Sequence, residues 1–157
     1  IYLNRVKLIK NTSQNVGLDH VHCLVGDSAE QHFHQKFDKI LIDAPCSGLG
    51  VLRRRSDLRW KKTPEDIANL TETQYLLLQK AAVSLKSGGE LVYSTCSIDL
   101  EENDQVIKHF LENYANFKLV NASERIPGSW VDEKGFIRTF PHLHDVDGSF
   151  AALFRKQ

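Results

Sequence analysis

Short apolar runs and longer amphipathic segments follow one another along the chain. The apolar runs are closed by turn-forming residues and predict buried strands, at residues 21–25, 39–43 and 90–96. Apolar residues at helical spacing predict helices, at residues 5–17, 63–87 and 99–113. Three shorter strands are predicted at residues 117–120, 136–140 and 149–154. Near-continuous apolar strands separated by helices indicate an α/β fold, with a mainly parallel sheet covered on both faces and an antiparallel edge.

The clearest helix start is at residues 63–66. Thr63 fits the N-cap and Pro64 the first helical position, and two acidic residues follow in the first turn. Gly88 and Gly89 are expected to end this helix before the next strand begins.

Composition places the chain among soluble globular proteins. Its 157 residues include 20 basic and 20 acidic side chains and are 41% hydrophobic, which excludes disordered, collagen-like and coiled-coil proteins. No apolar run approaches the roughly 20 residues of a membrane helix. We therefore predict one cytoplasmic domain over residues 1–157, without membrane contact. The zero net charge excludes a globally basic nucleic-acid binder but not a local basic patch.

The cysteines and histidines lack the spacing of a metal site. Cys23, Cys46 and Cys96 form no CxxC or Cys/His pattern, so we expect neither zinc nor a disulfide framework. His142 and His144 are expected in a solvated loop rather than around a metal ion. We therefore predict that the protein binds no metal ion.

Polar and reactive side chains follow the three predicted buried strands. Asp27 follows the first strand, Asp43 and Cys46 the second, and Cys96 the third. In parallel sheets, ligands bind outside the carboxyl ends of the strands. We therefore expect two thiols and two carboxylates on one edge of the sheet. An inert thiol is the alternative for each cysteine, and we keep that interpretation for Cys23, which lies within its predicted strand.

One basic cluster follows the second strand. It consists of Arg53, Arg54, Arg55, Arg59, Lys61 and Lys62 around Trp60. Such cations can contact phosphates while an aromatic ring stacks on bases, so the cluster fits RNA or DNA binding. A solvated surface without a ligand is the equally weighted alternative.

Several motifs together resemble one family, the RNA cytosine-5 methyltransferases, and within it the Sun/RsmB branch that methylates small-subunit ribosomal RNA. The motifs are Asp43-Ala44-Pro45-Cys46-Ser47-Gly48-Leu49-Gly50, Tyr93-Ser94-Thr95-Cys96-Ser97, Glu101-Glu102-Asn103 and Asp147-Gly148-Ser149-Phe150. The arginine-rich stretch that ends at Trp60 also resembles the family pattern, so the likeness spans almost the whole chain.

The resemblance implies a Rossmann-like class I methyltransferase fold that uses S-adenosylmethionine. It also implies that Cys96 is the nucleophile toward C6 of cytosine and that Cys46 assists release of the product. By the same resemblance, Asp27 lies near the adenine of the cofactor, and Asp43 lies where the cofactor and the target base meet. Arg53, Arg54, Arg55, Arg59 and Trp60 are then the expected RNA contacts.

The family pattern differs from this sequence at its front. A first strand with a glycine-rich loop and a second strand ending in an acid should precede residue 1, so we expect residues 1–157 to be the C-terminal two-thirds of a catalytic domain. Such a fragment should bind the cofactor poorly on its own. The alternatives are a non-catalytic RNA-binding or ribosome-assembly module and, more remotely, a thiol hydrolase or oxidoreductase.

Overall fold

The computed structural model describes residues 3–31 and 33–157. The chain divides into two units, Ile1–His32 and Phe33–Gln157, and each is described by itself. Whether both belong to one domain, as the sequence predicts, remains a prediction.

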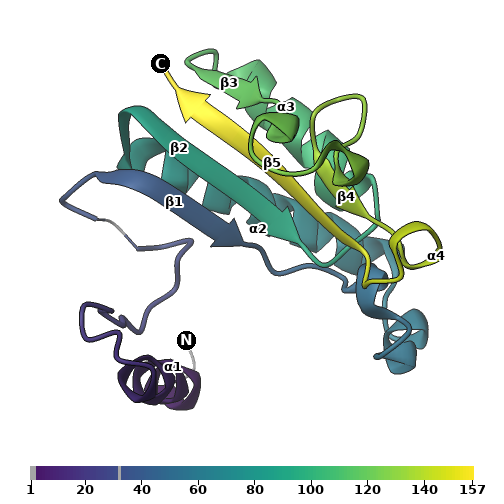
Figure 1. Ribbon diagram of the computed structural model, residues 1–157, viewed down its shortest axis with the longest axis horizontal. Coiled ribbons are helices and arrows are strands. Elements are labelled where there is room, and N and C mark those ends of the chain that lie inside the picture. The colour runs from purple at the N-terminus through teal and green to yellow at the C-terminus, as the bar shows by residue number, and fades with distance from the viewer. Residues whose placement is uncertain (1–2, 32) are drawn as a thin grey trace. The chain divides into compact units, whose positions relative to one another are not determined.

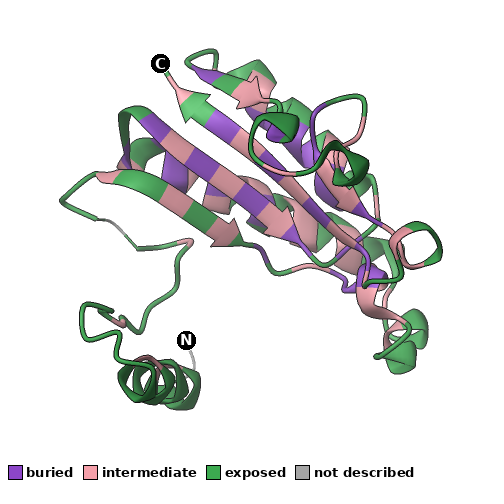
Figure 2. Ribbon diagram, viewed as in Figure 1, coloured by how far each residue is buried: buried purple, intermediate pink, exposed green. Residues whose placement is uncertain are grey.

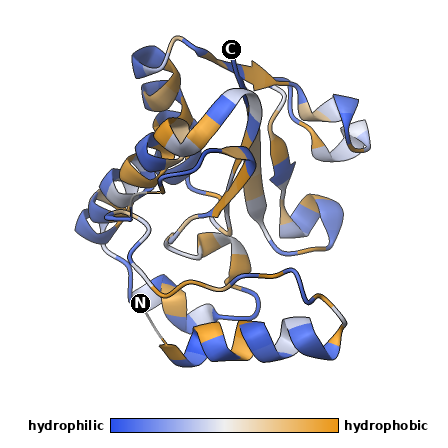
Figure 3. Ribbon diagram, turned by 90° about the vertical axis from the view of Figure 1, so that its left-hand side faces the viewer, coloured by the Kyte–Doolittle hydropathy of each residue, from blue (hydrophilic) through white to orange (hydrophobic). Residues whose placement is uncertain are grey.

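The first unit is built on helix α1 (Leu3–Asn15). Gly17 ends it with a φ of 74°, as its position in the sequence predicts. The helix is mainly hydrophilic, with hydrophobic positions interspersed (Figure 3). The strand predicted at residues 21–25 is wrong: the segment is irregular, and Leu24 is 70% exposed. A strand requires a hydrogen-bonded neighbour, and none of the described residues pairs with this segment.

The second unit contains a five-stranded sheet (Figure 1). Its strands are β1 (Phe37–Asp43), β2 (Leu85–Thr95), β3 (Phe117–Val120), β4 (Ile137–Thr139) and β5 (Ser149–Lys156). The order is β1-β2-β5-β3, and β4 pairs with β5. β1 and β2 are parallel, whereas β5 is antiparallel to each of its partners. The predicted α/β class is confirmed, but the described sheet is mixed rather than mainly parallel, because β5 runs antiparallel between β2 and β3 instead of at an edge.

Two longer helices connect the strands. The start of α2 (Pro64–Ser84) is confirmed, because Thr63 and Asp66 form a reciprocal capping box. Its end was predicted too late: β2 already begins at Leu85. Lys156 stabilises this earlier end, since its ammonium group donates to the carbonyl of Leu85 at 3.0 Å and to that of Ala82 in the last helical turn. α3 (Val106–Asn113) continues from a π-helical turn at Glu101–Gln105.

The remaining helical segments are single turns, at Leu49–Val51, Ser56–Trp60, Ala122–Glu124, Gly128–Trp130 and α4 (Pro141–His144). None of the helices among the described residues is long and apolar enough to cross a bilayer.

Within the second unit, α2 and α3 cover the same face of the sheet (Figure 1). Leu91, Tyr93 and Phe154 are fully buried between these layers, and the burial alternates along β2 (Figure 2). On the opposite face Leu41 pairs with Val92 across β1 and β2, and Leu41 is 69% exposed. The sequence predicts that both faces of the sheet are covered. Within this unit, helices α2 and α3 cover one face.

Candidate active site

The pairing of β1 with β2 brings the two cysteine loops together. Asp43 at the end of β1 pairs with Ser94 near the end of β2, so both chains leave the sheet side by side. The Gly50 amide then donates to the Cys96 carbonyl at 2.9 Å. As a result the sulfur atoms of Cys46 and Cys96 lie 3.2 Å apart, although 50 residues separate them in sequence. The predicted convergence of these two thiols is confirmed.

The two thiols have different surroundings. Cys96 is exposed, whereas Cys46 is half-buried. Burial raises the pKa of Cys46 to about 12, and the hydrogen bond with Cys96 and the charge of that neighbour contribute to the rise. Cys46 is therefore protonated at neutral pH, and Cys96 is the more accessible sulfur.

A buried polar cluster lies directly beneath the thiols. Its members are fully or almost fully buried: Ser47, Gln74, Ser97, Glu102 and Asn103. The Glu102 carboxylate accepts from the Ser47 hydroxyl at 2.5 Å and from the Ser47 amide at 2.7 Å. The hydroxyl oxygens of Ser47 and Ser97 are 3.2 Å apart. This cluster links the loop after β1 to the loop after β2.

The π-helical turn Glu101–Gln105 contributes two members of this cluster, Glu102 and Asn103. The amide of Gln105 donates to the carbonyl of Leu100, five residues earlier, at 3.0 Å. Asn103 in this turn accepts from the Thr95 hydroxyl at 2.7 Å and donates to the Ser97 carbonyl at 2.9 Å. The Tyr93 hydroxyl donates to the Glu102 carbonyl at 2.7 Å. Burial raises the pKa of Tyr93, and the negative charge of Glu102 raises it further.

Neither Glu102 nor Asn103 was predicted from the sequence to be a site residue. Two signals could have found them: both lie in one of the motifs of the family resemblance, and a serine follows each of the two cysteines. A glutamate in an acidic stretch is ordinarily a solvated surface residue, so only the three-dimensional contacts reveal its burial.

Part of the basic cluster is bound to carboxylates of the chain itself. The Arg53 guanidinium contacts Asp145 at 3.3 Å and Asp147 at 3.1 Å, and Arg54 also pairs with Asp147. These ion pairs tie the loop after β1 to the segment before β5. Trp60 is 84% exposed and lies in the same loop region. The RNA contacts remain predictions.

The two predicted carboxylates occupy different units. Asp43 is exposed at the carboxyl end of β1, and among the described residues its side chain has no hydrogen-bond partner. Asp27 lies in the first unit, where it accepts from the Ala29 amide at 2.9 Å. The role of either carboxylate in cofactor binding stays a prediction. No three metal-binding side chains gather among the described residues.

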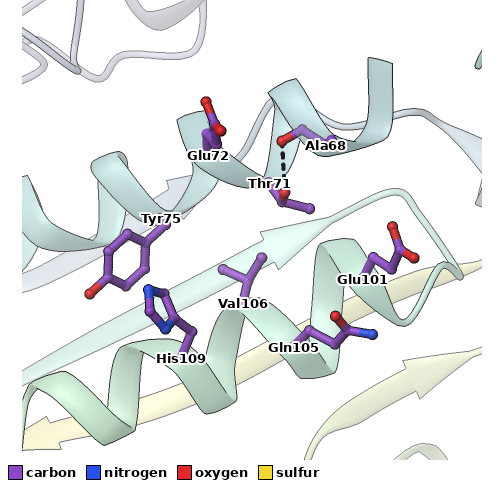
Figure 4. Close-up of a pocket in the computed structure, with 8 residues that line it drawn as sticks. All are labelled: Ala68, Thr71, Glu72, Tyr75, Glu101, Gln105, Val106 and His109. Atoms are coloured by element: carbon purple, nitrogen blue, oxygen red, sulfur yellow. Dashed lines mark hydrogen bonds between the residues drawn. The ribbon is translucent and has the colours of Figure 1, made fainter. Parts of the chain in front are cut away.

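A separate depression of about 280 Å³ lies between α2 and the segment that leads into α3. Figure 4 shows the ring of Tyr75 beside that of His109, and their centroids are 4.2 Å apart. The residues that line the depression include Glu72, Glu101 and Val106 but none of the predicted site residues. The depression is therefore distinct from the thiol pair.

Known proteins resemble the chain in both sequence and fold. A family model described as 16S rRNA methyltransferase RsmB/F matches residues 2–155. The probable ribosomal RNA small subunit methyltransferase B of Bacillus subtilis is 38% identical over 164 residues, which cover 100% of this chain and 36% of the relative. Ribosomal RNA small subunit methyltransferase F of Shewanella piezotolerans is 36% identical and covers 80% of the chain. The chain corresponds to 27% of that second relative.

Two solved structures from Pyrococcus horikoshii agree closely with the fold. NSun6, crystallised with SFG, superposes with a TM-score of 0.85 at 32% identity, over 99% of this chain and 39% of that one. A methyltransferase homolog protein gives 0.80 at 31% identity, over 98% of this chain and 50% of that one. The fold is thus the Rossmann-like fold of S-adenosylmethionine-dependent methyltransferases. With a family match over almost its whole length, the chain belongs to the RsmB/F family of 16S rRNA methyltransferases.

Proposed function

We propose that this chain carries the reacting side chains of an enzyme that methylates C5 of a cytosine in small-subunit ribosomal RNA. The observation that supports the proposal best is the 3.2 Å contact between an exposed and a half-buried thiol at the carboxyl ends of neighbouring parallel strands. Because the chain spans about a third of its curated relatives, the activity is proposed for the whole protein. We place that activity in the cytoplasm, where its RNA substrate would be assembled into ribosomes.

Cys96 is the nucleophile in this proposal. Carbon C5 of cytosine is a weak nucleophile, and addition of the Cys96 sulfur to C6 makes C5 carbanion-like. The new S–C6 bond is later broken when a base removes the proton from C5 and the electron pair expels the thiolate. The exposure of Cys96 fits attack on a base that has been unstacked from single-stranded or flipped-out RNA.

Cys46 is the base that removes the C5 proton, and its surroundings favour its ionisation after the adduct has formed rather than before. In the free site its raised pKa keeps it protonated. Once the Cys96 sulfur is bonded to C6, the coulombic contribution of Cys96 to the raised pKa of Cys46 is lost, while burial, the largest cause, remains. Cys46 then ionises more readily and accepts the C5 proton within the adduct.

Asp43 is the chain's best candidate for contact with the cofactor and the base. Its exposed carboxylate, without a partner among the described residues, is an acceptor three residues before Cys46. The carboxylate fits the amino groups of S-adenosylmethionine or cytosine. When bound, S-adenosylmethionine supplies the methyl group. Asp27 is proposed to contact the cofactor's adenine.

The RNA contacts are proposed for the outer part of the basic loop. Arg55, Arg59 and Trp60 are exposed and supply two guanidinium groups and an indole, which suits phosphate contact and base stacking, although Arg55 also pairs with Asp57 at 3.5 Å. Arg53 and Arg54 share the loop, and their ion pairs with Asp147 orient it.

The test is covalent trapping of RNA by the whole protein. With Cys46→Ala, release fails and a protein–RNA adduct that resists denaturation should accumulate. Cys96→Ala should form no adduct, and Cys23→Ala should behave as the unchanged protein because Cys23 lies outside the thiol pair. An adduct that persists without Cys96 would refute the assignment. RNA binding without any methyl transfer would instead favour a non-catalytic RNA-binding or assembly module.

A further inference from the structure

Cys46-Ser47 and Cys96-Ser97 are two copies of one dipeptide on neighbouring loops. The sulfur atoms lie 3.2 Å apart on the accessible side, and the serine hydroxyls lie 3.2 Å apart on the buried side. Both serines are at most 1% exposed, whereas both cysteines contact solvent. The serine contact therefore holds the backbones of the two loops in the register that brings the sulfur atoms together.

Glu102 orients this serine contact. The Ser47 hydroxyl proton is committed to the carboxylate, because the two oxygens are 2.5 Å apart. The Ser97 hydroxyl must then donate to the Ser47 oxygen, since two donors cannot face each other. A directed chain results, from Ser97 through Ser47 to Glu102.

Burial of the Glu102 carboxylate carries a desolvation penalty that destabilises the folded state. The side chain is 0% exposed, and no cation is among its hydrogen-bond donors, which are Ser47 and Gln74. Gln74 turns its amide nitrogen toward Glu102 and the Pro45 carbonyl. Its own carbonyl oxygen is left buried, without a partner among the described residues. An apolar cluster would stabilise these loops at a lower desolvation cost, so the arrangement points to a role beyond stability.

We propose that Glu102 is a positioning residue for the thiol pair: through the paired serines it holds the Cys46 sulfur within reach of the adduct on Cys96. This inference rests on the proposed function and deepens it. Formation of the S–C6 bond needs only the exposed Cys96, but removal of the C5 proton needs both sulfurs in register. Loss of the Glu102 carboxylate should therefore slow release more than addition.

The experiment compares Glu102→Gln with Glu101→Gln in the whole protein. The first substitution keeps the shape but replaces one acceptor oxygen by a donor. The second makes the same chemical change at the adjacent residue, which is exposed and outside the cluster. For Glu102→Gln we expect multiple-turnover methylation to fall roughly 10- to 100-fold, because sub-ångström misplacement of a reacting group has effects of this order. The denaturation-resistant RNA adduct should accumulate while its rate of formation changes little. Glu101→Gln should leave both unchanged.

A purely structural role predicts a different result. If adduct formation and turnover fall by the same factor, or if no adduct accumulates, the inference is wrong. Should Glu102→Gln fail to fold by circular dichroism, Ser97→Ala decides the question, since it removes one link of the chain and leaves the carboxylate bound to Ser47. That variant should accumulate adduct as well, and it refutes the inference if it does not. The Cys46→Ala protein separates the two hypotheses: without an adduct there, the proposed function itself fails.

Discussion

At the scale of single residues, the two thiols differ because one is shielded and the other is not. Desolvation is the largest cause of the raised pKa of Cys46, and the contact with Cys96 supplies the next two. The coulombic part of the contact with Cys96 would thus cease to oppose the ionisation of Cys46 when Cys96 is alkylated, while burial would continue to oppose it.

The effect of Cys96 on the pKa of Cys46 can be measured in the 157-residue chain itself. Replacing Cys96 by alanine removes the hydrogen bond and the coulombic contribution of Cys96, whereas burial of Cys46 by its other neighbours stays, so the pKa of Cys46 should fall below about 12. The pH dependence of iodoacetamide alkylation, read by peptide mass, reports this value. Cys23, in the other unit, serves as the internal control and should show the same profile in both chains. An unchanged midpoint for Cys46 would mean that burial alone raises its pKa.

At the scale of elements, two glycines let three loops meet behind the thiols. The Gly148 amide donates to the Gly50 carbonyl at 2.8 Å, and the Gly50 amide donates to Cys96. A Cβ at position 50 would overlap the Gly148 carbonyl oxygen and lie 2.7 Å from the Cys96 carbonyl oxygen. All of these neighbours are backbone atoms, so no side chain can move aside to accommodate the extra carbon.

Gly50→Ala should therefore destabilise the chain and separate the thiols. We expect the free energy of unfolding to fall by about 1–3 kcal/mol, as for other overpacked sites. Urea denaturation followed by circular dichroism measures the change. Gly128→Ala is the matched control, because a Cβ there meets nothing within 4 Å. Its effect should stay within about 0.5 kcal/mol. Equal effects of the two substitutions would contradict the close packing of these loops.

The elements that the sequence predicted correctly are those whose signals are local. The start of α2 follows from Thr63 and Asp66, which are three residues apart and form their capping contacts directly. The predicted strand at residues 21–25 failed because strand formation depends on a distant partner. Glu102 was missed for the same reason, since its partners Gln74 and Ser47 lie 28 and 55 residues away. The thiol pair was found because two parallel strand ends carry recognisable motifs.

At the scale of the whole molecule, β1 forms one edge of the described sheet. Among the described strands it pairs only with β2, so one side of its backbone has no strand partner. Leu41 and Val92 lie opposite each other on the sheet face that α2 and α3 leave uncovered. Leu41 is exposed and Val92 is half-buried, and an open strand edge beside an exposed apolar side chain is a common site of self-association.

The 157-residue chain should accordingly associate with itself through this edge. We expect its average mass in sedimentation experiments to rise with protein concentration, and Leu41→Lys to return it toward that of a monomer, because a charge on the strand opposes both apolar contact and strand pairing. Val83→Lys is the matched control: Val83 is 67% exposed against 69% for Leu41, but it lies on α2. A monomeric unchanged chain, or an equal effect of the two lysines, would show that β1 is not the associating edge. If Leu41→Lys alone disrupts association while the chain stays folded, the exposed face of β1 is the surface through which the chain associates.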